Sequence, residues 1–170
     1  MVKLNTIKNK IHKKCQKIKL VASDVDGVLT DGAMYYSVKG ELLKKFYTRD
    51  GMAVELLLQN NIPTVLITKE NSNIVTSRAK KIQATAFLGI NNKEQELQKI
   101  CKKFKVIPEE IAYIGDDVND ISLLKLVGFS ASPNNAVQEV KDIVNYVCKS
   151  NGGKGAFREV ADLIISSNKT

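Results

Sequence analysis

The sequence predicts an α/β fold: a Rossmann-like, three-layer arrangement in which helices cover both faces of a doubly wound parallel sheet. Two observations carry this prediction. Short apolar runs of strand length alternate with amphipathic stretches of helix length. Polar residues also follow several of the apolar runs, as expected where parallel strands end at a ligand site. The 170 residues are enough for a single domain, residues 1–170, with a sizeable core.

The predicted strands are short runs rich in branched apolar residues. Their nearly continuous apolar character is typical of strands that are covered on both faces. The runs are residues 18–23, 63–67, 84–88 and 111–114, with weaker edge candidates at 128–131 and 143–147.

Amphipathic stretches between these runs predict the helices. The clearest is residues 92–104, where Leu97, Ile100 and Phe104 share one helical face and Asn92 with Gln95 resembles a capping box. The predicted helices are residues 50–59, 72–82, 92–104, 117–127 and 155–165.

Residues 33–47 break this alternation and predict a β-hairpin insertion. Its strands are expected at residues 34–38 and 42–47, on either side of Lys39-Gly40-Glu41.

Residues 1–17 form a basic extension or an amphipathic helix, because apolar residues recur there at spacings of three and four. Seven lysines lie between Lys3 and Lys19 and supply much of the net charge of +8. A nucleic-acid arm or a membrane-surface helix would suit this segment. We instead expect a solvated face, with neither nucleic acid nor membrane as a partner, because lysines occur throughout the chain and no aromatic residue is interleaved here.

The apolar runs and the cysteines also bear on where in the cell the protein is expected. No stretch approaches the roughly 20 apolar residues of a membrane span, and no apolar core follows the basic N-terminus as in a secretory signal. A cytoplasmic protein is therefore expected. Cys15, Cys101 and Cys148 are far apart and form no C-x-x-C pair, so we expect thiols rather than zinc ligands or disulfides.

Polar residues of the types used in catalysis follow the predicted strands. Each one alone is weak evidence, since aspartates are common at helix caps and since Lys69 and Lys99 lie near the polar positions. Two carboxylates separated by one residue can present a nucleophile and a proton shuttle. In chain order the candidates are Asp24 and Asp26, Thr68, Lys93, and then Asp116, Asp117 and Asp120.

These residues stand as DVDG, Thr68, Lys93 and GDDVND, and in this order they resemble the haloacid dehalogenase superfamily of aspartate-dependent phosphotransferases. DVDGVLTDG, Arg49-Asp50-Gly51, AYIGDD and GGKGAFRE (residues 152–159) are similar to the small phosphatases that release 3-deoxy-D-manno-octulosonate from its 8-phosphate. Sister enzymes acting on nine-carbon, sialic-acid-type 9-phosphates share this pattern. The resemblance implies a fold without a cap domain, and the predicted elements leave no room for one.

The resemblance implies a Mg²⁺ ion held by Asp24, Asp116 and the backbone carbonyl of Asp26. Such an ion neutralises the repulsion between a phosphate dianion and a carboxylate nucleophile. Asp117 and Asp120 are then expected to support the metal or orient its neighbours.

The remaining residues complete the implied reaction. Asp24 attacks phosphorus, and Asp26 protonates the leaving alkoxide and then activates the hydrolytic water. Lys93 adds a fixed positive charge, and Thr68 donates a hydrogen bond to a phosphoryl oxygen. A dehalogenase would not need Asp26, so its presence favours phosphoester chemistry.

Features of both subfamilies occur in this chain. Lys154 and Arg158 are candidates for the sugar carboxylate, although Arg158 also fits a surface helix charge. Thr68 is followed by Lys69-Glu70, where the octulosonate phosphatases commonly have Gly-Arg. Glu70 together with Arg78 is more like the nine-carbon enzymes. The leading prediction is octulosonate 8-phosphate, in lipopolysaccharide sugar biosynthesis, and the alternative is a nine-carbon acid of the KDN or N-acylneuraminate type.

The resemblance also implies a homotetramer, because small members of the superfamily without a cap complete the pocket with a neighbouring subunit, here expected through the hairpin. Two other classes of protein fit the sequence less well. A phospho-accepting signalling domain carries its acceptor after the third strand, whereas the Asp-x-Asp here follows the first. An inactive binding subunit is disfavoured because every required carboxylate is present.

Overall fold

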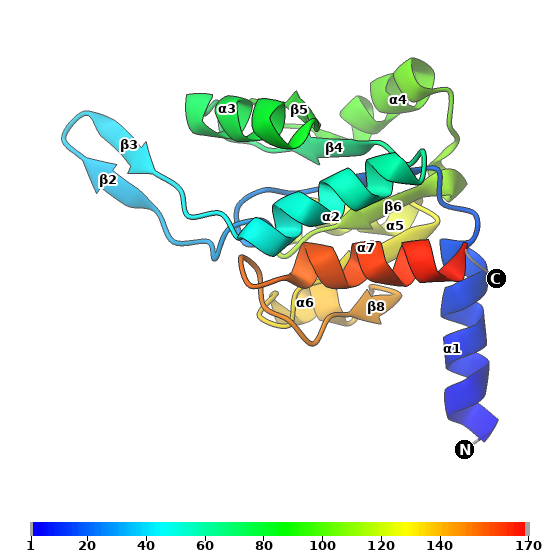
Figure 1. Cartoon of the computed structure of the whole chain (residues 1–170). Helices are drawn as coiled ribbons and strands as arrows, with labels where there is room; N and C mark the ends of the chain where they lie inside the picture. Colours follow the sequence, from blue (N-terminus) through cyan, green and yellow to red (C-terminus); the bar gives the residue numbers. More distant parts are fainter. Residues whose placement is uncertain (1, 169–170) are drawn as a thin grey trace.

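Six parallel strands form the central sheet, in the order β5-β4-β1-β6-β7-β8 (Figure 1). The computed structural model describes residues 2–168, with side chains from residue 9 onward. Each strand falls inside its predicted run, except that β7 ends one residue beyond it, and every pairing is parallel, which confirms the doubly wound parallel sheet. The strands are β1 (Leu20–Ser23), β4 (Thr64–Ile67), β5 (Thr85–Phe87), β6 (Ile111–Ile114), β7 (Phe129–Ser132) and β8 (Tyr146–Val147).

Helices cover both faces of this sheet. On one face lie α2 (Thr48–Gln59), α3 (Asn73–Ile82) and α7 (Ala156–Ser167), and on the other lie α4 (Lys93–Phe104) and α5 (Ile121–Leu126). Strand β1 shows how alternation serves the two cores. Val21 packs in the cluster of α2 and α7, while Leu20 and Ala22 pack in the cluster of α4 and α5.

The predicted helix 117–127 is wrong in its first turn. Residues Val118–Asp120 form a 3-10 turn, η2, and α5 begins only at Ile121. The Asp117 side chain accepts a hydrogen bond from the Val118 N–H, and Asp120 bonds backward to the loop, so both aspartates hold the chain out of a regular helix. The sequence did not predict η1 (Pro108–Glu110) or α6 (Gln138–Lys141), because these elements are too short to show a helical periodicity of apolar residues.

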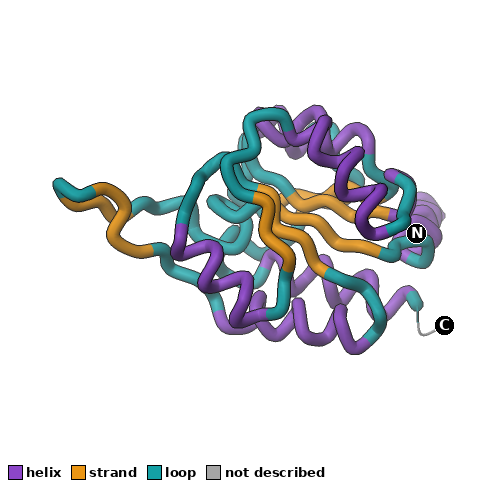
Figure 2. The backbone as a smooth tube through the Cα atoms, turned by 90° about the horizontal axis from the view of Figure 1, so that it is seen from above, coloured by secondary structure: helices purple, strands orange, loops and turns teal. Residues whose placement is uncertain are grey.

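The hairpin differs from its prediction in length and turn. Its strands are β2 (Tyr35–Ser37) and β3 (Gly40–Leu43), so Gly40 lies in a strand, with a φ of 105°, and the turn is Val38-Lys39. Residues 44–47 leave the hairpin and lead into α2. Figures 1 and 2 both show the hairpin projecting from the body of the molecule.

The basic N-terminal segment is a helix, α1 (Val2–Cys15), whose outer end points away from the sheet (Figure 1). Its last residue, Cys15, is buried against the core that includes α7. Among the residues that the structure describes, no helix combines the length and the apolar character needed to cross a bilayer.

Candidate active site

The sheet brings the predicted polar residues to one edge. Strand β1 lies between β4 and β6, and the residues that follow these three strands face one pocket of about 370 Å³. Backbone bonds fix two of them: the Asp24 N–H donates to the Ile114 carbonyl at 2.9 Å, and the Thr68 N–H to the Phe87 carbonyl at 3.0 Å. The lining residues are Asp24, Asp26, Met34, Thr68, Lys69, Glu70, Asp116, Asp117, Val118 and Asn119.

Two glycines allow this edge to close tightly. Gly27 has a φ of 92°, and a Cβ atom there would lie 1.9 Å from Asp116 Oδ2, so only glycine lets Asp116 approach the loop after β1. A Cβ at Gly152 would lie 1.7 Å from the Gly27 carbonyl oxygen. The first glycines of the GGKGAFRE segment therefore pack against the loop that carries Asp24 and Asp26.

Lys93 lies beneath the pocket and joins its acidic groups. The side chain is 3% exposed, and its ammonium lies 3.0 Å from Asp24 Oδ1 and 2.5 Å from Asp120 Oδ1. Burial opposes the charge on Lys93, but the two carboxylates outweigh it and raise its pKa. By contrast, Lys99 pairs with Glu96 on the surface of α4. Lys93 is therefore the lysine beside Asp24.

Asp120 is occupied by protein partners. Its Oδ1 accepts hydrogen bonds from Lys93 and from the Tyr113 hydroxyl, the latter at 2.6 Å. Its Oδ2 accepts from the backbone N–H groups of Asp116, at 3.0 Å, and Asp117, at 3.5 Å. Asp120 thus orients the lysine and the acidic loop from below.

Asp24 and Asp116 are better suited than Asp120 to hold a cation. One oxygen from each of the three carboxylates lies within 4.8 Å of the others. Asp116 Oδ1 is buried and has no hydrogen-bond partner among the described residues. Burial, together with the Asp24 and Asp120 charges, raises the pKa of Asp116 to about 8. Burial and the Asp120 charge raise the pKa of Asp24 to about 7, against the opposing effect of Lys93. This excess of buried negative charge and hard oxygen donors fits Mg²⁺.

Asp26 and Thr68 line the same pocket as Asp24. Asp26 Oδ1 accepts a hydrogen bond from Lys44 at 2.7 Å, and Thr30 Oγ1 lies 3.4 Å away. The Thr68 hydroxyl accepts from the Glu70 N–H at 3.1 Å, which leaves its own O–H free to donate into the pocket.

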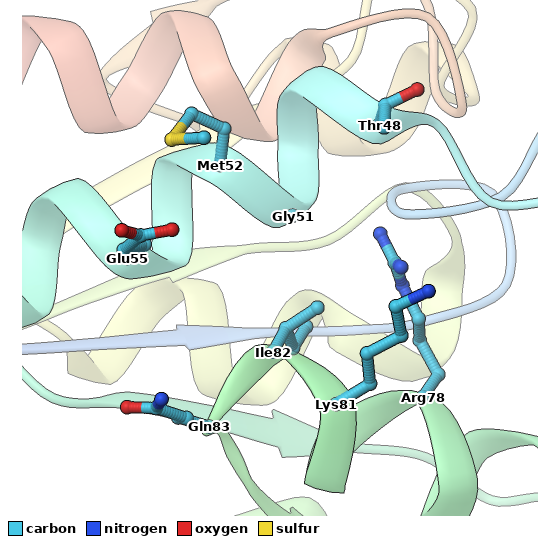
Figure 3. A pocket seen from close by; sticks show the side chains of 8 residues that line it. All are labelled: Thr48, Gly51, Met52, Glu55, Arg78, Lys81, Ile82 and Gln83. Carbon is cyan, nitrogen blue, oxygen red and sulfur yellow. The ribbon is translucent and has the colours of Figure 1, made fainter.

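The four substrate candidates do not gather in one place. Glu70 lines the carboxylate pocket. Arg78 lines a separate groove of about 230 Å³ between α2 and α3, where it points toward α2 beside Lys81 (Figure 3). Lys154 is exposed on the loop before α7, and the Arg158 Nε donates to Asp162 at 2.8 Å along that helix. Of these four candidates, only Glu70 lines the carboxylate pocket of its own chain.

Two motifs of the sequence have structural roles. Asp50 is buried, and its Oδ1 accepts the Arg158 N–H at 2.9 Å, so α2 caps the N-terminus of α7. Glu159 accepts hydrogen bonds from the backbone N–H groups of Lys149 and Ser150 and from the Tyr146 hydroxyl. These contacts fix the loop that supports Gly27.

Sequence reasoning missed Lys44 and Tyr113. Tyr113 carried a signal, because a hydroxyl in the otherwise apolar strand β6, directly before the acidic cluster, needs a buried partner. Lys44 carried none, since Lys45 beside it looks the same and lies on the surface.

Known proteins resemble this chain in sequence and in fold. Residues 58–160 match the model of the haloacid dehalogenase-like hydrolases. The 3-deoxy-D-manno-octulosonate 8-phosphate phosphatase of Haemophilus influenzae is 37% identical over 92% of this chain and 88% of its own. A HAD superfamily hydrolase structure from Legionella pneumophila has a TM-score of 0.97 at 32% identity and covers 99% of this chain and 93% of that one. The octulosonate phosphatase of Moraxella catarrhalis, solved with magnesium, phosphate and KDO, has a TM-score of 0.91 at 35% identity, covering 95% and 93%.

Fold and site together define a haloacid dehalogenase-like hydrolase, and the chain belongs to that family. It is a phosphomonoesterase that resembles the octulosonate 8-phosphate phosphatases, and no cap domain is present between residues 2 and 168.

Proposed function

We propose that the whole chain acts as one Mg²⁺-dependent phosphatase domain that hydrolyses 3-deoxy-D-manno-octulosonate 8-phosphate to the free sugar acid and phosphate. The observation that carries this proposal is the set of Asp24, Asp116 and Lys93 beside an open pocket, in a chain similar along most of its length to enzymes of that activity. Lipopolysaccharide sugar biosynthesis is the corresponding pathway.

In the proposed reaction Asp24 attacks phosphorus, its bond to phosphorus forms as the ester P–O bond breaks, and Asp26 gives its proton to the departing alkoxide. Asp26 then takes a proton from water as that water attacks the aspartyl phosphate and regenerates Asp24. Lys93 keeps Asp24 oriented and partly neutralised, and the Thr68 hydroxyl donates to a phosphoryl oxygen.

Asp24, Asp116 and the backbone carbonyl of Asp26 are the proposed Mg²⁺ ligands. When bound, the ion supplies the positive charge that offsets repulsion between the phosphate and the carboxylates. The unpaired Asp116 Oδ1 supports this assignment, as does the magnesium in the Moraxella relative. Asp117 and Asp120 are proposed to support the ligands from outside, since Asp120 is already committed to Lys93 and Tyr113.

A homotetramer is part of this proposal, with the hairpin as the contact. Met34, at the base of the hairpin, lines the carboxylate pocket and is 48% exposed. Arg78, Lys154 and Arg158 lie outside the pocket of their own chain, so we propose that they serve substrate recognition in an adjacent subunit. We place the enzyme in the cytoplasm, because a sugar-acid phosphate carries several charges and does not cross a bilayer.

Phosphate release from the eight-carbon and nine-carbon 2-keto-3-deoxy acid phosphates tests the substrate directly, with Asp24→Asn as the blank. We expect a higher kcat/KM for the eight-carbon acid. A preference for the nine-carbon acid would instead favour the alternative that Glu70 raises, since Glu70 lines the pocket. Hydrolysis of neither substrate by a folded oligomer would favour an inactive binding subunit.

A further inference from the structure

Lys44 is a buried lysine at the rim of the candidate active site that the reaction above does not use. Its side chain is 1% exposed, and its ammonium lies 2.7 Å from Asp26 Oδ1 and 2.6 Å from Glu41 Oε1. A buried ammonium is costly unless it is paired, and here two carboxylates pair with it. The position of Lys44 is therefore tied to the position of Asp26.

The next residue provides a natural comparison. Lys45 has a side chain that is 60% exposed, and it pairs with Asp31 at 3.1 Å on the surface. Where the chain leaves β3, it thus turns one lysine into the site and the other toward solvent. Of these two lysines, Lys44 alone contacts a residue of the proposed reaction.

Glu41 fixes Lys44 from the side opposite to Asp26. Glu41 lies in β3, and its Oε2 accepts a hydrogen bond from Ser72 Oγ at 2.7 Å. Ser72 stands just before α3, on the segment that begins at Thr68. The series Ser72, Glu41, Lys44 and Asp26 therefore connects the segment after β4, the hairpin and the loop after β1.

The contact also distinguishes the two oxygens of Asp26. Oδ1 faces the Lys44 ammonium, and an oxygen that accepts from an ammonium cannot direct a proton of its own toward it. Oδ2 has no hydrogen-bond partner among the described residues. Lys44 therefore holds the Asp26 carboxyl group by one oxygen, Oδ1, and leaves Oδ2 without a protein partner among the described residues.

We propose that Lys44 is a positioning residue that orients the Asp26 carboxyl group for proton transfer, held in place by Glu41 and Ser72. The inference rests on the function proposed above, in which Asp26 is the general acid and base. Lys44 itself contacts neither the phosphate nor the leaving group in this account.

The test uses leaving groups that differ in their need for an acid. An alkyl phosphate, such as the sugar-acid phosphate, must have its alkoxide protonated, whereas p-nitrophenyl phosphate releases a stable phenolate. The kcat/KM value reports the step in which the leaving group departs. The ratio of kcat/KM for the two substrates is measured for the wild type, Lys44→Met, Lys44→Arg and the matched control Lys45→Met.

We expect Lys44→Met to lower the alkyl-to-aryl ratio by about 10- to 100-fold, a part of what general acid catalysis supplies. Lys44→Arg should recover most of the ratio, and Lys45→Met should leave it at the wild-type value. Because the fraction of folded enzyme cancels in the ratio, a loss of stability alone cannot produce this result.

An unchanged ratio in Lys44→Met, with both substrates slowed equally or not at all, would overturn the positioning role and leave only a structural one. A wild type that hydrolyses neither substrate would instead contradict the proposed function itself.

Discussion

The carboxylate edge, where Asp24, Asp116 and Asp120 meet at the ends of the strands, differs from the hairpin in how its side chains are covered. At the edge, Asp24, Lys93 and Asp120 are buried and bonded to one another. On the hairpin, Tyr36, Val38 and Leu42 are exposed, Val38 fully so. Large apolar side chains gathered on one exposed projection indicate a contact surface. The comparison teaches that the acidic groups and Lys93 are assembled within one chain, whereas the hairpin leaves large apolar side chains uncovered, as the proposed homotetramer requires.

The largest expected effect is the loss of activity in Asp24→Asn, which should leave the oligomeric state unchanged. Asp24→Asn removes the proposed nucleophile, and we expect kcat to fall by about 10⁴- to 10⁶-fold. The molar mass in solution should not change, because Asp24 does not touch the hairpin surface. Phosphate release and light scattering measure both quantities on one sample. Asp31→Asn, in the same loop but outside the pocket, serves as the control. Substantial turnover by Asp24→Asn would break the account of the carboxylate edge.

Gly152→Ala tests whether the carboxylate edge depends on the close packing of Gly152 against Gly27. The added Cβ would meet the Gly27 carbonyl oxygen, so we expect the free energy of unfolding to fall by about 3 kcal/mol, with a loss of turnover in the folded fraction. Gly40→Ala, in the hairpin where a Cβ meets nothing within 4 Å, is the comparison variant, although its φ of 105° carries strain. Denaturant melts measure both. A smaller cost at Gly152 than at Gly40 would contradict the proposed support.

A charged hairpin tests the other region. We expect the double variant Val38→Asp/Leu42→Asp to shift the molar mass toward the 18.8 kDa monomer. The kcat/KM for the sugar-acid phosphate should fall by about tenfold or more, the effect of losing one charged contact from a neighbour. Hydrolysis of p-nitrophenyl phosphate should be retained, since the carboxylate edge is intact. A wild type that is monomeric in solution would contradict the proposed contact through the hairpin.

Proton competition for the metal site gives the smallest effect. Because the pKa values of Asp24 and Asp116 are raised to about 7 and about 8, protons compete with Mg²⁺ below these values. We expect Mg²⁺ affinity to weaken by about tenfold per pH unit for each proton displaced, and the acid limb of activity to move to lower pH as Mg²⁺ increases. Calorimetric titrations at two pH values measure this. Affinity independent of pH would contradict the assignment of these ligands.

The same values fix the sign of a stability effect. Both carboxyl groups hold protons more tightly in the folded state than in the unfolded chain. Their contribution to stability is therefore complete below pH 4 and is lost as the pH rises through about 7 and about 8 in the metal-free protein. Added Mg²⁺ should restore stability above pH 8. Thermal melts with and without Mg²⁺ show whether this occurs.

Residues next to buried strands could be placed from the sequence, and residues fixed by long-range packing could not. Asp24, Thr68 and Asp116 each follow an apolar run, so parallel pairing alone brings them to one edge. Lys44 is buried only because the chain turns after β3, and the neighbouring Lys45 gives the same local signal. The predicted turn at Lys39-Gly40-Glu41 is one residue too late, because Gly40, the residue that indicated a turn, pairs with Ser37 in the strand.

The central claim is that Asp24 carries the phosphoryl group during turnover. The direct measurement is acid-quench mass spectrometry of the enzyme mixed with octulosonate 8-phosphate and Mg²⁺, followed by trypsin, which releases residues 20–39 as one peptide. We expect a transient phosphate adduct that fragmentation assigns to Asp24. In Asp26→Asn we expect a longer-lived adduct from p-nitrophenyl phosphate, whose leaving group needs no acid, because hydrolysis of the intermediate is slowed. Turnover with no adduct in either protein, or an adduct on another residue, would contradict the account. An adduct that forms on the wild type and persists without turnover would instead favour a signalling domain.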